Sequence, residues 1–212
     1  VGQLHNIPGK PDTIAPAILK TDSEKYRQPV VLTDFFSFWA EHNHVCTGSV
    51  LMRTEIVKQT GGQRPELRVN EDIEFWAYLA TYGPWGFIPK VLFVSDGGVI
   101  VKSQGWKKYK NRLSKIPDFE QWFSRIDGKI DKVQHKALCP VFNRVIEGQS
   151  RAMLVNGEIV RSRRNILDNH SGLANSDNLH VRLAVTNGLY WYVFGMFYRF
   201  YQHFKIRILS KL

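Results

Sequence analysis

The sequence predicts an α/β domain followed by a mainly α-helical, basic extension, and three observations lead to this fold class. Short apolar runs alternate with helix-like segments over residues 30–95. The surplus of positive charge is confined to the second half of the chain, and the last thirty residues follow one long aromatic, amphipathic pattern. We therefore expect two domains, residues 1–102 and residues 103–212.

Length and composition exclude several classes of protein. With 212 residues the chain can bury a sizeable core, and its 43% hydrophobic and 23% charged residues argue against a disordered, collagen-like or polytopic membrane protein. Two cysteines, Cys46 and Cys139, cannot build a disulfide framework and suit a reducing compartment. The chain opens on Val1 without a signal-peptide pattern, so we expect it to begin inside a longer natural protein.

The net charge of +10 is distributed unevenly. Residues 1–102 hold 10 Lys and Arg against 11 Asp and Glu, whereas residues 103–212 hold 19 against 8. A near-neutral first half argues against nucleic acid as its main ligand. The basic second half predicts an anionic partner, which leaves a membrane surface, a nucleic acid or an acidic protein open.

In the first half, the apolar run Val50–Met52 predicts a buried strand. A short helix is expected from Thr54, ended by Gly61 and Gly62, which adopt left-handed backbone at low steric cost. A second helix is expected to open at Asn70 and to stop at Gly83, with further strands at Ile88 and at residues 91–94.

In the second half, helical patterns cover residues 118–126, 140–156 and 158–167, and residues 170–178 form a polar loop. A final helix is expected over residues 179–209. The chain contains no internal repeat and no low-complexity tract.

A constellation of residues between positions 47 and 76 resembles the second half of a family 2 glycosyltransferase with the GT-A fold. Its parts occur in the family order: a small-residue strand end, a Gly-Gly helix stop, an acidic pair and an aromatic residue after the pair. The residues are Thr47–Arg53, Gly61, Gly62, Glu66 and Asn70–Trp76. The resemblance is best over residues 45–95 and looser over residues 149–167.

The resemblance implies roles for these residues. It makes Asp72, with Glu71 beside it, the catalytic acid pair, and Asp72 the general base. Thr47, Gly48, Ser49 and Trp76 would lie near the donor sugar and the acceptor. A carboxylate suits this chemistry, because an attacking hydroxyl must lose its proton to a group within hydrogen-bond reach. The alternative is purely structural, since acidic residues after an Asn commonly cap a helix and offset its dipole.

The family also uses a divalent cation, Mg²⁺ or Mn²⁺, held by an Asp-x-Asp motif that ends an N-terminal nucleotide-binding half. No Asp-x-Asp occurs in the 212 residues. The resemblance therefore implies a chain that keeps the acceptor side and the base but lacks the groups that hold the donor pyrophosphate. Gln63, Ala77 and Tyr78 also depart from the family pattern.

Three potential metal ligands alternate at His42, His44 and Cys46, which would place them on one face of a strand. Structural zinc usually takes a fourth ligand, so ordinary packing or acceptor contact is the better interpretation, and no metal site is predicted here.

The segment 179–209 predicts an amphipathic helix. Only 16 uncharged residues separate Arg182 from Arg199, whereas a membrane-crossing helix needs about 20 mainly apolar residues. We expect the helix to lie in the interface of an anionic membrane, with Trp191 and tyrosines at headgroup depth. The alternative is a helix packed on the domain or in a dimer.

Together these observations predict an inverting glycosyltransferase that moves a sugar from a nucleotide-sugar donor to a glycan or lipid-linked acceptor hydroxyl. Cell-surface polysaccharide or glycolipid synthesis is the setting the resemblance implies, with the protein peripheral at the inner face of the cell membrane and no nucleic acid partner. One alternative is a non-catalytic module that holds single-stranded nucleic acid through Trp106, Tyr109 and Arg112. Another is a structural scaffold in which the acidic pair only caps a helix.

Overall fold

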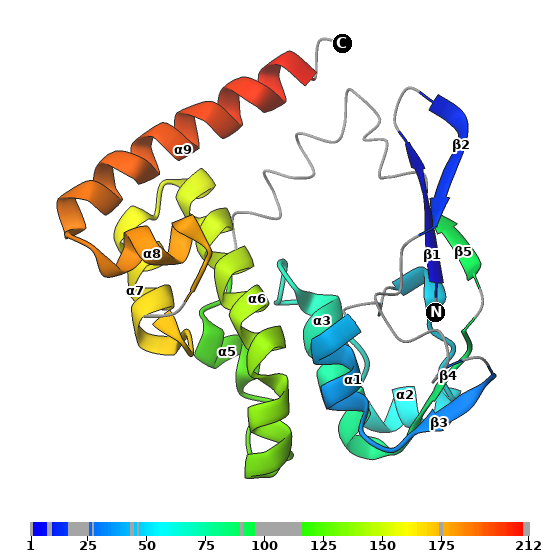
Figure 1. Cartoon of the computed structure of the whole chain (residues 1–212). Coiled ribbons are helices and arrows are strands. Elements are labelled where there is room, and N and C mark those ends of the chain that lie inside the picture. Colours follow the sequence, from blue (N-terminus) through cyan, green and yellow to red (C-terminus); the bar gives the residue numbers. More distant parts are fainter. Residues whose placement is uncertain are drawn as a thin grey trace. The chain divides into compact units, whose positions relative to one another are not determined.

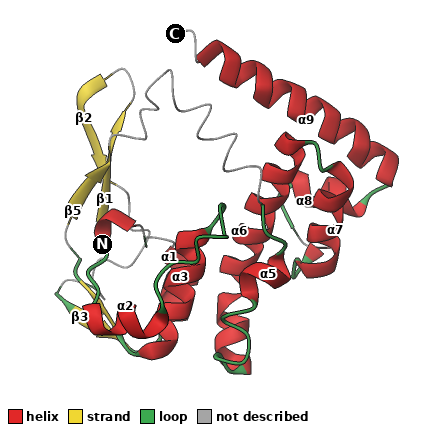
Figure 2. Ribbon diagram, turned by 180° about the vertical axis from the view of Figure 1, so that it is seen from behind, coloured by secondary structure: helices red, strands yellow, loops and turns green. Residues whose placement is uncertain are grey.

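The computed structural model describes residues 2–7, 10–16, 26, 28–42, 45, 47–89, 91–95, 116–173 and 176–209. The chain forms two compact units, each assembled from separated segments. Unit 1 comprises residues 1–63, 74–99 and 128–141, and unit 2 comprises residues 64–73, 100–127 and 142–212. The boundary at residue 102 stays a prediction. Figure 1 and Figure 2 show the elements from opposite sides.

Unit 1 contains two small sheets. In the first, β1 (Gly2–Ile7) lies between β2 (Lys10–Pro16), which is antiparallel to it, and β5 (Val91–Ser95), which is parallel to it (Figure 1). In the second, β3 (Val30–Leu32) pairs antiparallel with β4 (Trp85–Phe87). The fold is therefore a helix-rich α/β fold, and these sheets do not show a GT-A fold.

The helices of unit 1 bury an aromatic core. They are α1 (Phe35–His42), α2 (Thr54–Thr60) and most of α3 (Glu71–Leu79), with short 3₁₀ turns η1 (Thr47–Ser49) and η2 (Ala80–Tyr82). Asp34 caps α1, because its Oδ1 accepts the Ser37 amide at 3.0 Å, and the Ser37 hydroxyl holds the Asp34 pKa below its usual value. Phe35 stacks on Trp85 with ring centroids 4.2 Å apart.

Unit 2 is helical in its described part. It contains α5 (Phe119–Phe123), the C-terminal part of α6 (Lys132–Asn156), α7 (Ile159–Asn169), α8 (Leu179–Val185) and α9 (Gly188–Leu209). Helices α7, α8 and α9 pack on one another (Figure 2). Ser150 on α6 and Ser162 on α7 each donate a hydroxyl to the other's carbonyl, at 3.2 and 2.8 Å, and both are fully buried. These bonds satisfy both buried hydroxyl groups.

Most predicted helices are confirmed, but several predictions need correction. The strand expected at Ile88 is β4, which spans Trp85–Phe87 and ends before Ile88. The predicted strand at Val50–Met52 is wrong, because these residues pair with no strand in the described sheets and Leu51 is 100% exposed. The final helix is two helices, because the chain breaks at Thr186 and Asn187 caps α9 through the Leu189 amide at 2.8 Å. His42 lies at the end of α1 and not on a strand, while His44 and Cys46 fall outside the described residues.

Candidate functional site

The acidic pair lies at the first turn of α3, where the sequence predicts it. The residue before the pair, Asn70, has a positive φ of 59°, a left-handed conformation that Asn tolerates better than most residues. Its carbonyl accepts the indole N–H of Trp122 at 2.9 Å, and its Nδ2 donates to the Val145 carbonyl at 3.4 Å. These two hydrogen bonds hold Asn70 in place, and they therefore set the position at which α3 begins.

Glu71 and Asp72 line a pocket of about 440 Å³ that is built wholly from residues of unit 2. We call it the acid-pair pocket. Its wall comes from the 68–72 segment, from α6 and from α9. The lining residues are Arg68, Val69, Asn70, Glu71, Asp72, Gly148, Arg151, Ala152, Val155, Tyr198 and Gln202.

Asp72 reaches the pocket with one carboxylate oxygen engaged. Its Oδ1 accepts the backbone N–H of Ile73 at 2.9 Å, which caps the first turn of α3. In the part of the chain that the structure describes, its Oδ2 makes no hydrogen bond. The side chain thus combines the capping role expected of an acid at a helix start with a second oxygen able to accept a proton.

Helix α6 supplies a glycine and an arginine to the pocket wall. A Cβ on Gly148 would lie 3.4 Å from Asn70 Nδ2, so the glycine lets the residue before the acid pair approach α6 closely. Arg151 lies 3.6 Å from Glu147 and keeps 43% of its side chain exposed. Its guanidinium therefore retains donors for a ligand in the pocket.

Glu147, the partner of Arg151, belongs to a half-buried polar network. His170 Nε2 lies 3.2 Å from its Oε1, and Asn178 Nδ2 donates to its Oε2 at 2.6 Å. Burial raises the pKa of Glu147, but the hydrogen bond and charge of His170 and the charge of Arg151 outweigh burial and leave that pKa below its usual value. The Glu147 carboxylate therefore stays ionised and holds Arg151 in place at the pocket wall.

Helix α9 closes the other side with Tyr198 and Gln202. Burial raises the pKa of Tyr198, with the charge of Arg151 and a hydrogen bond involving Gln202 acting in the opposite direction. Tyr198 and Val69 pack against a buried apolar cluster formed by Ile116, Ala152, Met153 and Val155. The lining of the pocket therefore combines a few apolar side chains, among them Val69 and Val155, with acids, arginines and amides.

This arrangement can bind a polyhydroxylated or anionic ligand and accept a proton from it. Carboxylates accept hydrogen bonds from hydroxyls, and arginines bind oxyanions in a fixed geometry. The apolar lining residues suit the face of a sugar ring or another flat apolar surface.

The described residues do not form a metal site. No group of three or more His, Cys, Asp or Glu side chains within them is placed to hold a metal ion. The acid pair contributes two carboxylates beside two arginines, which is a poor donor set for Mg²⁺ or Mn²⁺.

The other predicted site residues lie in unit 1. Thr47, Gly48 and Ser49 form η1, a partly exposed 3₁₀ turn and not a strand end. Trp76 is 1% exposed and belongs to the aromatic core beside Phe75. Their assignment as sugar-binding residues stays a prediction.

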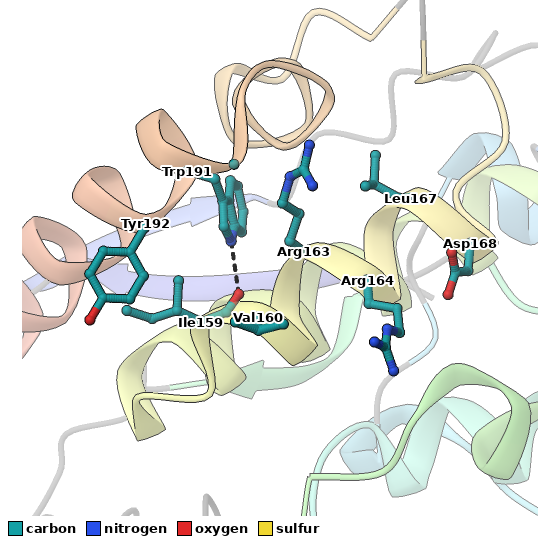
Figure 3. A pocket seen from close by; sticks show the side chains of 9 residues that line it. Ile159, Val160, Arg163, Arg164, Leu167, Asp168, Trp191 and Tyr192 are labelled. Atoms are coloured by element: carbon teal, nitrogen blue, oxygen red, sulfur yellow. Dashed lines mark hydrogen bonds between the residues drawn. The ribbon is translucent and has the colours of Figure 1, made fainter.

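A second hollow of about 330 Å³ lies along α7 where α9 begins (Figure 3). The buried indole of Trp191 donates to the Ile159 carbonyl at 2.9 Å. Arg163 donates to the Ala184 and Thr186 carbonyls at 2.9 and 2.7 Å, which caps the end of α8. These contacts make the hollow a structural junction of three helices.

Sequence reasoning missed Arg68, Arg151, Tyr198 and Gln202 as pocket residues. One local signal for the pocket lies on α9. Tyr198 and Gln202 follow Trp191 and Gly195 at helical spacing, so the four residues share one face of the helix. Comparison with protein-family models, curated proteins and solved structures found no match for this chain.

Proposed function

We propose that the acid-pair pocket is the acceptor side of an inverting, nucleotide-sugar-dependent glycosyltransferase. The observation that carries the proposal is the meeting of Glu71 and Asp72 with two arginines in one pocket of unit 2. The resemblance of residues 45–95 to family 2 glycosyltransferases supports the same function. Asp72 is the proposed general base.

The proposed step is a single displacement. The acceptor hydroxyl oxygen forms a bond to the anomeric carbon, the bond from that carbon to the nucleoside diphosphate breaks, and the hydroxyl proton passes to the Asp72 carboxylate. The Oδ2 atom is the better acceptor, since Oδ1 already accepts the Ile73 amide. Arg68 and Arg151 add positive potential, which favours an anionic donor or acceptor group.

The experiment measures nucleoside diphosphate release by the complete gene product from a panel of UDP-, GDP- and dTDP-sugars, with a detergent extract of cell lipids and glycans as acceptor. Asp72→Asn keeps the side-chain size and the cap oxygen but removes proton acceptance. We expect turnover to fall by roughly 10²- to 10⁴-fold, with donor affinity unchanged within a few-fold.

Asp127→Asn is the matched control, because Asp127 is an exposed acid of unit 2 outside the pocket. It should keep wild-type turnover. Turnover of Asp72→Asn equal to that of Asp127→Asn would refute the assignment, and the acid pair would then be only a helix cap.

We further propose the inner face of the cell membrane as the place of this reaction, in polysaccharide or glycolipid assembly. Among the described residues, no helix is both long enough and apolar enough to cross a bilayer. Attachment of α9 to one face of the membrane is the arrangement that fits this helix. The aromatic and basic residues of the single-stranded nucleic acid alternative, Trp106, Tyr109 and Arg112, lie outside the described residues.

A further inference from the structure

Helix α9 leaves a large apolar surface uncovered. Within unit 2, nine of its large hydrophobic side chains are between 46% and 71% exposed. We call this set the α9 apolar face, and it consists of Leu189, Tyr190, Tyr192, Val193, Met196, Phe197, Phe200, Tyr201 and Phe204. Single exposed hydrophobic residues are ordinary, but a contiguous set on one element marks an interaction surface.

The opposite side of α9 attaches the helix to its own unit. Trp191 is buried there, and a Cβ on Gly195 would lie only 2.9 Å from Ile159 Cγ2. At about 100° per residue, Trp191, Gly195 and Tyr198 fall on one side of the helix and the apolar face occupies the other half. Since α9 is already packed on one side, its apolar face is available to a partner outside unit 2.

The charged residues near the α9 apolar face indicate the charge of the partner. From residue 178 to residue 212 the sequence contains no Asp or Glu and five Lys or Arg residues. Lys205 is exposed on α9, and Arg182 is exposed on α8. An anionic partner is therefore favoured, whereas a second copy of this chain would bring two positive segments together.

We propose that α9 docks on an anionic phospholipid bilayer, lying in the headgroup plane with its apolar face toward the acyl chains. Tyrosines and phenylalanines along a helix with basic residues and no acids are the composition of interfacial helices. Lys205 contributes attraction to anionic headgroups, and the nine apolar side chains contribute burial that salt does not screen.

Docking in this orientation bears on the substrate of the acid-pair pocket. Tyr198 and Gln202 project from the packed side of α9 into that pocket, so the helix that meets the bilayer also forms a wall of the site. If the proposed function holds, the acceptor hydroxyl belongs to a lipid or to a glycan anchored in the same bilayer. The identity of the acceptor rests on the proposed function, whereas docking of α9 does not.

The experiment measures flotation of the complete chain with vesicles of phosphatidylcholine alone and of phosphatidylcholine with about 30% phosphatidylglycerol. We expect at least tenfold stronger partition onto the anionic vesicles, reduced but not abolished by high salt. The double variant Phe197→Ser/Phe200→Ser should lower partition at least tenfold at low and high salt. Lys205→Gln should lower it about fivefold at low salt only.

Val31→Ser/Val133→Ser is the matched control, because these two side chains are also exposed, at 64% and 75%, but lie in unit 1. It should bind vesicles like the wild type, and circular dichroism should show all variants folded. Asp72→Asn should also bind like the wild type, so failure of docking and failure of the proposed chemistry are distinguishable.

Three outcomes would overturn the docking proposal: no binding of the wild type to anionic vesicles, equal binding of the Phe197→Ser/Phe200→Ser variant, or a dimer by analytical ultracentrifugation that this variant dissociates while vesicles fail to bind. The last result would assign the apolar face to a second copy of the chain.

Discussion

The indole nitrogen of Trp122 donates a hydrogen bond of 2.9 Å to the carbonyl oxygen of Asn70, the residue immediately before the acidic pair. Trp122 is fully buried and stands 52 residues further along the chain. Because the donor is a fully buried side chain, the bond holds the left-handed Asn70, and with it the start of α3, in one position. Trp122 therefore acts as a positioning residue for Asp72.

Trp122→Phe tests this relationship. Phenylalanine keeps most of the apolar contact but leaves the Asn70 carbonyl without its donor, at a cost of about 1–3 kcal/mol in the free energy of unfolding. If Trp122 positions the base, nucleoside diphosphate release should fall by about tenfold with little change in donor affinity.

Trp191→Phe is the control, since the Trp191 indole makes an equivalent 2.9 Å bond to the Ile159 carbonyl. Urea denaturation should show similar losses of stability for both variants. Equal turnover in the two variants would mean that the Trp122 bond is only structural.

Local signals explain which helices could be predicted. Gly61 ends α2 in a left-handed conformation, with φ of 75°, as the Gly-Gly pair indicated. The start of α6 was missed, although Asp131 and Gln134 form a capping box in which Asp131 Oδ1 accepts the Gln134 amide at 2.8 Å and Gln134 Oε1 accepts the Asp131 amide at 3.0 Å. The helical pattern over residues 140–156 places Pro140 first in that helix, whereas the helix begins at Lys132 and Pro140 lies within it.

The acid-pair pocket could be predicted only in part. Glu71 and Asp72 stand out because an acidic pair at a helix start has a chemical meaning by itself. Arg151 and Tyr198 give no such indication in the sequence, because they become pocket residues only when α6 and α9 fold against the 68–72 segment. Their contribution depends on contacts between residues about 80 and 130 positions apart, which helical periodicity does not encode.

Gly195 is expected to be indispensable for the packing of α9. A Cβ at this position would lie 2.9 Å from Ile159 Cγ2 and 3.1 Å from Leu154 Cδ2, so Gly195→Val should overpack the junction and cost about 1–3 kcal/mol, measured by urea denaturation. Gly188→Ala, in the first turn of the same helix, should stay within about 0.5 kcal/mol of wild type, because the nearest atom is Arg163 Nη1 at 3.9 Å.

A double-mutant cycle identifies the cause of the Gly195→Val effect. Ile159→Ala removes the Ile159 atoms that the new side chain would meet and leaves Leu154 Cδ2, so Gly195→Val should cost less in that background than in the wild type. An identical cost in both backgrounds would show that the clash with Ile159 is not the reason for the glycine.

The stability of unit 2 should depend on pH through His180. This side chain is buried beneath α9 against Trp191 and Phe194, and among the described residues neither ring nitrogen has a hydrogen-bond partner. Burial, and next the charge of Arg151, lower the pKa of His180 from 6.5 to about 4, with Glu147 acting in the opposite direction and His170 in the same one.

The sign of the effect follows from the proton balance. Between pH 6.5 and pH 4 the unfolded chain binds a proton at His180 that the folded chain does not, so stability is fully present above pH 6.5 and decreases as the pH falls. Between pH 7.5 and pH 5 the loss should be about 2 kcal/mol. This range avoids the protonation of Glu147, whose pKa lies below its usual value.

His180→Phe separates this contribution from those of other groups. Phenylalanine fits an aromatic environment and cannot be protonated, so the variant should lose about 2 kcal/mol less than the wild type between pH 7.5 and pH 5 in urea denaturation. Because α9 packs on His180 through Trp191, the wild type should also release vesicles more readily at pH 5 than the variant does. Parallel stability profiles for the two proteins would show that His180 is protonated equally in the folded and unfolded chains, and the buried, neutral histidine would be refuted.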